Sequence, residues 1–228
     1  MAPMVRLVLF DIDGTLVHTG GAGVKAFAKV FATEFGAHEG IERMKFAGRT
    51  DVSLVREFFS LHNIPATSAN FERFFERYVH WLDHLLAHSQ SEECPGVRSL
   101  IADLQTLPEP PLLGLLTGNV RLGAEIKLRH FGLWDYFETG GFADDHEDRN
   151  HIAAVAKQRG ERMLGRKLAG EEIVVIGDTP LDIRCGRAIE AKVLAVATGG
   201  WRLEELEAHK PDWLVADLRG LRAAEICG

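Results

Sequence analysis

Short apolar runs along the chain predict buried β-strands. Each run is rich in Val, Leu or Ile and is bounded by polar or turn-forming residues. A parallel sheet is covered on both faces, so its strands have this nearly continuous apolar composition. The predicted strands are Val5–Phe10, Leu112–Leu116, Tyr136–Thr139, Ile173–Ile176, Val193–Ala197 and Trp213–Val215.

Apolar residues at helical spacing separate these runs over the later part of the chain. The predicted helices there are Val97–Leu107, Val120–His130, Asn150–Met163 and Leu181–Glu190. Strands that alternate with helices imply a parallel sheet with helices on both of its faces. We therefore predict an α/β fold.

Residues 19–90 break this alternation. The segment opens with the flexible joint Thr19–Gly23, and Cys94-Pro95-Gly96 follows its end. Between them lie three amphipathic helical patterns with no strand among them. These patterns are Val24–Phe35, Val52–Leu61 and Phe71–Leu86. The sequence therefore predicts an all-helical insert in the α/β core.

Composition and charge narrow the class of protein. The chain has 228 residues, 46% hydrophobic and 26% charged, which are ordinary values for a globular protein. A formal net charge of −7 disfavours binding to nucleic acid or to an anionic membrane, because both need basic patches. No apolar run is long enough to span a bilayer, and Met1–Met4 leads into the first predicted strand without the features of a signal peptide. Three widely spaced cysteines, Cys94, Cys185 and Cys227, indicate reduced thiols, so we expect a cytoplasmic protein.

Three predicted strands end in polar side chains that can carry chemistry. The pairs are Asp11 with Asp13, Thr117 with Asn119, and Asp178 with Asp182. The carboxyl ends of parallel strands meet at one edge of the sheet, so these side chains converge on one site. Close carboxylates repel one another unless a cation or a proton intervenes. This edge of the sheet therefore predicts a metal site, phosphate chemistry, or both.

Three motifs at these strand ends resemble those of the haloacid dehalogenase superfamily. They are Phe10-Asp11-Ile12-Asp13-Gly14-Thr15-Leu16, Leu116-Thr117-Gly118-Asn119 and Ile176-Gly177-Asp178-Thr179-Pro180-Leu181-Asp182. The chain is most similar to the phosphoglycolate-phosphatase-like branch, which carries a helical cap after the first motif. The resemblance implies a Rossmann-like core of residues 1–18 and 91–228 and a cap domain of residues 19–90.

The resemblance implies a Mg²⁺-dependent phosphatase that acts through an aspartyl-phosphate. Asp11 would attack phosphorus, and Asp13 would protonate the leaving oxygen and then deprotonate water. Dehalogenases of the superfamily lack a carboxylate at the second position, so Asp13 favours phosphoryl transfer. Asp11, the backbone carbonyl of Asp13, and Asp178 would hold Mg²⁺. Asp182 is either an outer ligand of the metal or the partner of a nearby cation.

Four further residues are expected to bind the substrate. The hydroxyl of Thr117 would donate to the phosphoryl group, and Gly118 and Asn119 would offer backbone N–H groups at a helix start. Arg49, in Gly48-Arg49-Thr50-Asp51, resembles a cap-loop residue that faces the active site in this branch.

Two positions depart from the family pattern. The family usually has a lysine in its third motif, but here the segment Ala143–His151 contains none, and we expect Arg149 to supply the positive charge. Glu190 stands where the family usually has a glycine in a left-handed helix cap, so it would be mildly strained there.

Two other functions remain open from the sequence alone. One is a sugar-phosphate mutase of the β-phosphoglucomutase type, and the other is a non-catalytic binding scaffold on the same fold. The substrate would be a small phosphorylated metabolite that the sequence does not identify. No residue pattern reports the oligomeric state, for which we expect a monomer or a weak homodimer. His80, His84 and His88 have metal-ligand spacing, but a solvated helix face is the simpler interpretation.

Overall fold

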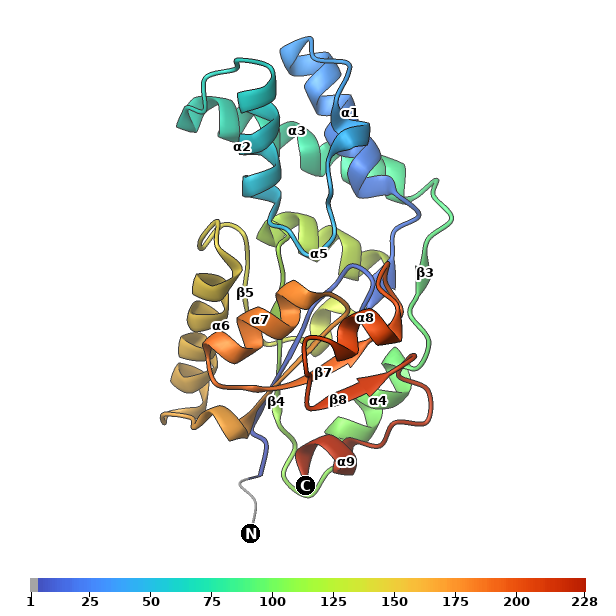
Figure 1. Ribbon diagram of the computed structural model, residues 1–228, viewed down its shortest axis with the longest axis vertical. Helices are drawn as coiled ribbons and strands as arrows, with labels where there is room; N and C mark the ends of the chain where they lie inside the picture. The colour runs from blue at the N-terminus through green and yellow to red at the C-terminus, as the bar shows by residue number, and fades with distance from the viewer. Residues whose placement is uncertain (1–3) are drawn as a thin grey trace.

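A six-stranded parallel sheet forms the centre of the protein in the computed structural model, which describes residues 4–228 (Figure 1). The order across the sheet is β5-β4-β1-β6-β7-β8. The strands are β1 (Leu7–Phe10), β4 (Leu112–Leu116), β5 (Thr139–Gly141), β6 (Ile173–Gly177), β7 (Lys192–Val196) and β8 (Trp213–Val215). The predicted α/β fold is therefore confirmed.

Register places the three motif-bearing strands level with one another. Phe10 at the end of β1 lies beside Leu115 of β4 and Ile176 of β6. The residues that follow each strand consequently emerge at the same edge of the sheet, as the carboxyl ends of parallel strands do. β1 is central, so Asp11 is flanked by the ends of both neighbouring strands.

Helices cover both faces of the sheet. One face packs against α4 (Val97–Gln105), α5 (Arg121–His130) and α9 (Ala223–Cys227). The other packs against α6 (Arg149–Leu164), α7 (Pro180–Ala188) and α8 (Leu203–Glu207). None of the helices in residues 4–228 is both long enough and apolar enough to cross a membrane.

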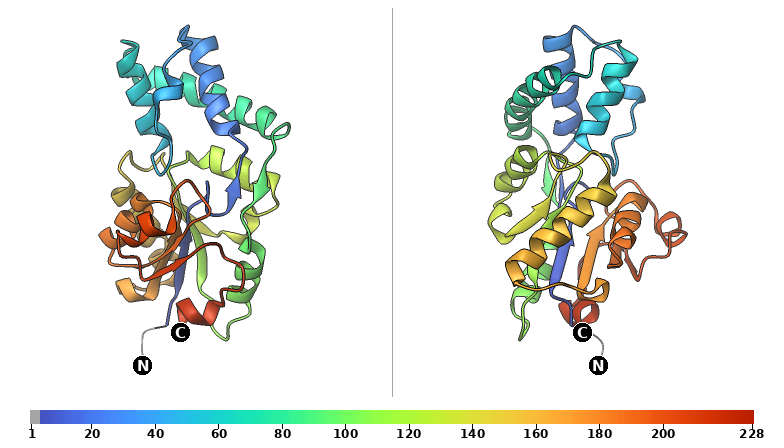
Figure 2. Two further views of the ribbon diagram at one scale, coloured as in Figure 1. Left: turned by 45° about the vertical axis from the view of Figure 1, so that its right-hand side comes forward. Right: turned by 90° about the vertical axis from the view of Figure 1, so that its left-hand side faces the viewer.

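Three helices stand together above the carboxyl edge of the sheet, away from the two termini (Figure 2). They are α1 (Ala22–Phe35), α2 (Asp51–Leu61) and α3 (Ser68–Leu86). Their core is largely aromatic, with Phe31 stacked on Phe58 at 3.6 Å between ring centroids. Aromatic side chains bury much area and so give a small helical unit a core of its own.

Two antiparallel connections join these helices to the rest of the protein. The short strands β2 (Val17–His18) and β3 (Glu92–Glu93) pair with each other on either side of the helical segment. A Cβ at Gly20 would lie 2.5 Å from the backbone oxygen of Gln90, so glycine is required where the two connections meet. On this basis we propose that residues 19–90 form a cap domain and that residues 1–18 and 91–228 form the core. Residues 1–3 lie outside the described part of the chain.

The structure corrects one predicted strand and adds short elements. Residues 136–138 do not form a strand, because Trp134–Tyr136 is a 3₁₀ turn and the strand runs from Thr139 to Gly141. The aromatic residues of this turn pack against the core, which produced the misleading apolar run. Glycines carry little strand signal, yet Gly141 is needed because a Cβ there would lie 2.5 Å from the Ile152 oxygen. The short elements β2, β3, α8, α9 and a 3₁₀ turn at Ile41–Arg43 were not predicted.

Glu190 adopts the left-handed conformation expected from its position. Helix α7 ends at Ala188, two residues before the predicted end, and Glu190 follows with a φ of 63°. A left-handed backbone costs a residue with a Cβ about 1–2 kcal/mol, whereas glycine adopts it freely.

Replacing Glu190 with glycine is therefore expected to stabilise the protein. Glycine removes the backbone strain of the folded state, but it also gives the unfolded chain more conformational entropy, which costs about 0.4–1 kcal/mol of stability. Because the strain is the larger of the two, the free energy of unfolding should rise by up to about 1 kcal/mol. Urea denaturation measures this difference. Glu138→Gly is the matched control: Glu138 is exposed and does not have a positive φ, so that variant should be destabilised. Equal destabilisation of both variants would contradict the account.

Candidate active site

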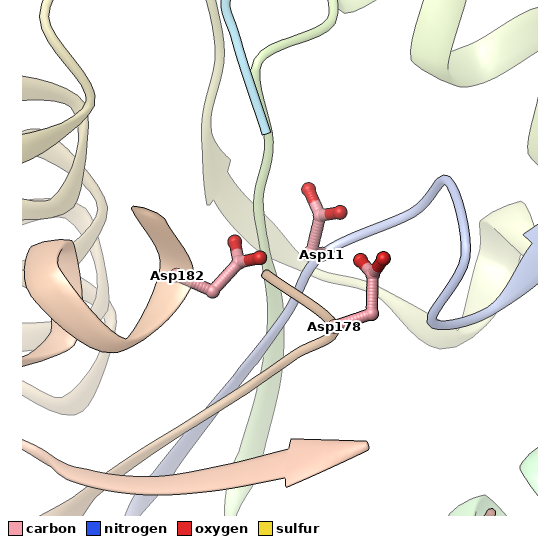
Figure 3. Close-up of side chains that lie close together, drawn as sticks. All are labelled: Asp11, Asp178 and Asp182. Atoms are coloured by element: carbon pink, nitrogen blue, oxygen red, sulfur yellow. The ribbon is translucent and has the colours of Figure 1, made fainter. Parts of the chain in front are cut away.

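Three buried carboxylates gather where β1 and β6 end. Asp11 follows β1, Asp178 follows β6, and Asp182 lies in the first turn of α7 (Figure 3). One oxygen from each residue lies within 4.8 Å of the others. Burial, and then the neighbouring Asp182 carboxylate, raise the pKa of both Asp11 and Asp178 above the ordinary aspartate range. The cluster is therefore short of positive charge, which suits a cation.

Two glycines leave the space that the Asp178 carboxylate occupies. A Cβ at Gly199 would lie 1.7 Å from its Oδ2 atom, and a Cβ at Gly14 would lie 2.6 Å from the same atom. The hydroxyl of Thr15 donates to the other oxygen, Oδ1, at 3.3 Å. The Asp178 carboxylate is thus closely surrounded by backbone and lies beside Asp11. Two oxygen donors held this way fit a hard divalent cation such as Mg²⁺.

Asp182 has other partners for both carboxylate oxygens. Its Oδ1 accepts a hydrogen bond from Arg149, and its Oδ2 accepts from the backbone N–H and the hydroxyl of Thr179, at 3.0 and 2.6 Å. Of the two roles considered for Asp182, this geometry favours the partner of the nearby cation.

Arg149 places a buried positive charge next to Asp11, the predicted nucleophile. It is the first residue of α6, which is capped by the Asp148 side chain. Its Nη2 atom lies 3.2 Å from Asp11 Oδ1, and its Nη1 donates to the backbone oxygen of Gly48 in the cap at 3.2 Å. The Nε atom is buried with no hydrogen-bond partner among the described residues. Arg149 thus lies next to Asp11, where we expected the positive charge of the third motif, and its Nε–H group remains available as a donor.

Thr117 and Asn119 follow β4 on the opposite side of Asp11. The amide Nδ2 of Asn119 donates to Thr117 Oγ1 at 2.8 Å and to Asp13 Oδ2 at 2.8 Å. The backbone N–H of Asn119, which we expected to face the phosphate, instead donates to Thr117 Oγ1 at 3.2 Å. The Thr117 oxygen therefore accepts twice, and its own proton is free to donate elsewhere.

Lys127 is a site residue that the sequence analysis missed. It lies on α5 with only 4% of its surface exposed, and its ammonium group contacts Asp13 and Asn119. One signal was available: Lys127 falls on the same stripe of α5 as Ala124 and Leu128, which face the core. A charged residue on an apolar helical stripe points to a buried partner.

The cap loop before α2 is docked on this site. The backbone N–H of Asp51 donates to the Gly118 oxygen at 2.7 Å, and Asp51 Oδ2 accepts from the backbone N–H of Val120 at 2.8 Å. The hydroxyl of Thr50 donates to the Glu147 oxygen at 2.9 Å. A Cβ at Gly118 would lie 2.2 Å from the Arg49 oxygen, so this position must be glycine. The structure therefore has the cap closed over the core.

Cap and core together enclose a cavity of about 180 Å³. The residues from the core include Asp11, Asp13, Thr117, Asn119, Lys127, Arg149 and Asp178. The cap contributes the apolar side chains of Phe27, Phe46 and Leu54, among others, together with the polar side chains of Asp51 and Tyr78. Arg49 also lines the cavity, but its guanidinium group pairs with Glu57 of α2. His80 and His84 of α3, and His88 just beyond its end, are exposed, as expected for a solvated face.

Comparison with known families identifies the class of this enzyme. The sequence model of the haloacid dehalogenase-like hydrolases matches residues 8–196, which is most of the chain. The chain therefore belongs to this family. The predicted family is confirmed, and with it an enzyme rather than a non-catalytic scaffold.

Individual relatives resemble the chain over nearly its whole length. A putative pyrophosphatase PpaX from Clostridium perfringens is 26% identical over 218 residues, covering 93% of each protein. A phosphoglycolate phosphatase from Agrobacterium fabrum is 24% identical over 228 residues, covering 97% of this chain and 93% of the relative. The crystal structure of CbbY from Rhodobacter sphaeroides in complex with phosphate superposes with a TM-score of 0.74 at 19% identity, covering 96% of each chain. This structural likeness confirms the fold.

The buried Asp51 predicts an unusual dependence of stability on pH. Burial raises its pKa from 3.8 to about 7, although Lys127 and the Val120 N–H act in the opposite direction. The folded protein thus binds this proton more tightly than the unfolded chain does, so the contribution to stability is lost as the pH rises toward 7. Asp51→Asn cannot ionise and keeps an acceptor for Val120. Its free energy of unfolding relative to wild type should rise by on the order of 2 kcal/mol between pH 5 and pH 8.

Denaturant titrations at several pH values measure this difference. Asp135→Asn is a suitable control, because the Asp135 side chain is 89% exposed. Wild-type and Asp51→Asn curves that stay parallel across this pH range would contradict the assignment of Asp51.

Proposed function

We propose that this protein is a Mg²⁺-dependent phosphatase that hydrolyses a small phosphorylated metabolite through an aspartyl-phosphate on Asp11. The observation that carries the proposal is the position of Asp11. Its carboxylate lies in the enclosed cavity between the Arg149 guanidinium, 3.2 Å away, and Thr117 at the end of the adjacent strand. A carboxylate nucleophile flanked by a guanidinium group and a hydroxyl donor suits phosphoryl transfer.

The first step transfers the phosphoryl group to Asp11. A carboxylate oxygen of Asp11 bonds to phosphorus while the bond to the leaving oxygen breaks, and Asp13 supplies the proton that this oxygen needs. Arg149 and the free proton of Thr117 stabilise the charge on the phosphoryl oxygens. In the second step Asp13 takes a proton from water, which attacks phosphorus and releases phosphate and the Asp11 carboxylate.

Asp11, Asp178 and the backbone carbonyl of Asp13 would hold the metal ion, with Asp182 acting through Arg149. When bound, Mg²⁺ neutralises charge as the phosphate oxygens approach the carboxylates. The shortage of positive charge around Asp11 and Asp178 supports this assignment.

The size of the cavity supports a small substrate. A volume of about 180 Å³ leaves space for a phosphoryl group and a small leaving group while the cap is closed. The relatives named pyrophosphatase and phosphoglycolate phosphatase also bear names of small phosphorylated compounds. Three free, buried cysteines are compatible with the predicted cytoplasmic location.

Phosphate release tests the proposal together with the metal. Wild-type protein with Mg²⁺ should release phosphate from p-nitrophenyl phosphate, EDTA should abolish the release, and added Mg²⁺ should restore it. Asp178→Asn keeps the size of the side chain but loses a charged ligand, so activity should fall by about 100-fold or more at the same Mg²⁺ concentration. The exposed Asp135→Asn is the control. Equal activity in EDTA and in Mg²⁺ would rule out the metal role.

The same assay separates hydrolysis from isomerisation. A screen of phosphorylated metabolites should yield free phosphate in proportion to the substrate consumed. Formation of a phosphorylated isomer without phosphate release would instead indicate the mutase considered from the sequence.

A further inference from the structure

We propose that Lys127 is a positioning residue that orients two groups of the phosphoryl-transfer site. One is the carboxylate of Asp13, which transfers protons, and the other is the hydroxyl of Thr117, which binds the phosphate. The inference rests on the proposed phosphatase function and adds to it a group outside the family's motifs. Lys127 belongs to none of the three strand ends. It reaches the site from two turns inside α5.

The ammonium group of Lys127 directs its donors at three oxygens. Its Nζ atom lies 2.8 and 2.6 Å from the two carboxylate oxygens of Asp13 and 2.6 Å from Asn119 Oδ1. The Asp13 side chain is 44% exposed, whereas that of Lys127 is 5% exposed. The buried lysine is thus the fixed partner, and it restrains a carboxylate that would otherwise rotate in the cavity.

Lys127 also decides the orientation of the Asn119 amide. An ammonium group only donates, so it must face the oxygen of the amide and not the nitrogen. The nitrogen is then turned toward Thr117 Oγ1 and Asp13 Oδ2, both at 2.8 Å. The side-chain amide and the backbone N–H of Asn119 both donate to the Thr117 oxygen, so the proton of the Thr117 hydroxyl points away from Asn119. A chain of hydrogen bonds therefore runs from Lys127 through Asn119 to the hydroxyl that receives the phosphoryl group.

The closed cap completes the environment of Lys127. A Cβ at Gly23 of α1 would lie 3.9 Å from both Lys127 Nζ and the Tyr78 hydroxyl oxygen. A larger residue at this position would stand beside the ammonium group. Helices α1 and α3 of the cap thus cover Lys127. A buried ammonium group is costly unless it is paired, so Lys127 needs its contacts with Asp13 and Asn119 to remain in this position.

Replacing Lys127 with methionine keeps an unbranched chain and removes the ammonium donors. With p-nitrophenyl phosphate and saturating Mg²⁺ we expect kcat to fall by about 100-fold, the size of effect that a misplaced catalytic group produces. KM should change by less than about 5-fold, because Arg149 and the metal site remain in place. Lys25→Met, the same substitution at an exposed position of α1, should keep wild-type kcat. A folded Lys127→Met protein with wild-type kcat would overturn the proposal.

Chemical rescue separates positioning from a general effect on folding. Lys127→Ala leaves space for a small amine, so ethylammonium ions should raise its kcat by at least about 10-fold. Tetramethylammonium, which carries charge but no N–H donor, should not. Equal responses to the two cations, or no response to either, would mean that Lys127 acts only through charge or through the stability of the fold, and would overturn the inference.

The controls keep this test distinct from that of the proposed function. If wild type and Lys25→Met release no phosphate from any phosphate monoester, the phosphatase assignment fails. If both are active and Lys127→Met is equally active, the assignment stands and the role of Lys127 is refuted.

Discussion

Repulsion among buried carboxylates is the constraint on which the rest of this structure depends. Asp11, Asp178 and Asp182 meet at one edge of the sheet with oxygens within 4.8 Å of one another. The fold tolerates this arrangement because Arg149 lies against two of the three carboxylates. A single guanidinium group leaves the cluster negative, and that remaining charge suits a divalent cation, which would in turn offset the repulsion between these carboxylates and a phosphoryl group. The arrangement is costly for stability and useful for catalysis.

The same charges connect the cap to the core. Arg149 donates to the cap at Gly48 while it contacts Asp11, and Asp51 of the cap binds the backbone at the start of α5. Cap position and active-site geometry therefore share hydrogen bonds. Closure limits the access of bulk water to the cavity, which strengthens the electrostatic interactions inside it.

Sequence reasoning predicted the parts of the structure that depend on local pattern. Strand β4 and strand β8 were predicted to the residue, and the convergence of Asp11, Thr117 and Asp178 followed from parallel strands alone. Strand β5 was misplaced, because two of its three residues are glycines that close packing requires and that strand patterns do not reveal. Long-range contacts were missed for a different reason. The position of Lys127 on the apolar stripe of α5 indicates a buried partner, but nothing in the local sequence identifies that partner as Asp13, 114 residues away.

In the proposed mechanism, Asp11 is the group that accepts the phosphoryl group from the substrate, and every other role depends on this one. Quenching the enzyme with acid within milliseconds of mixing with a phosphorylated substrate, followed by peptide mass spectrometry, measures this directly. We expect a phosphate on the peptide that contains Asp11, appearing before free phosphate and absent from Asp11→Asn. Turnover that continues without any phosphorylated enzyme, or a phosphate on another residue, would contradict the account.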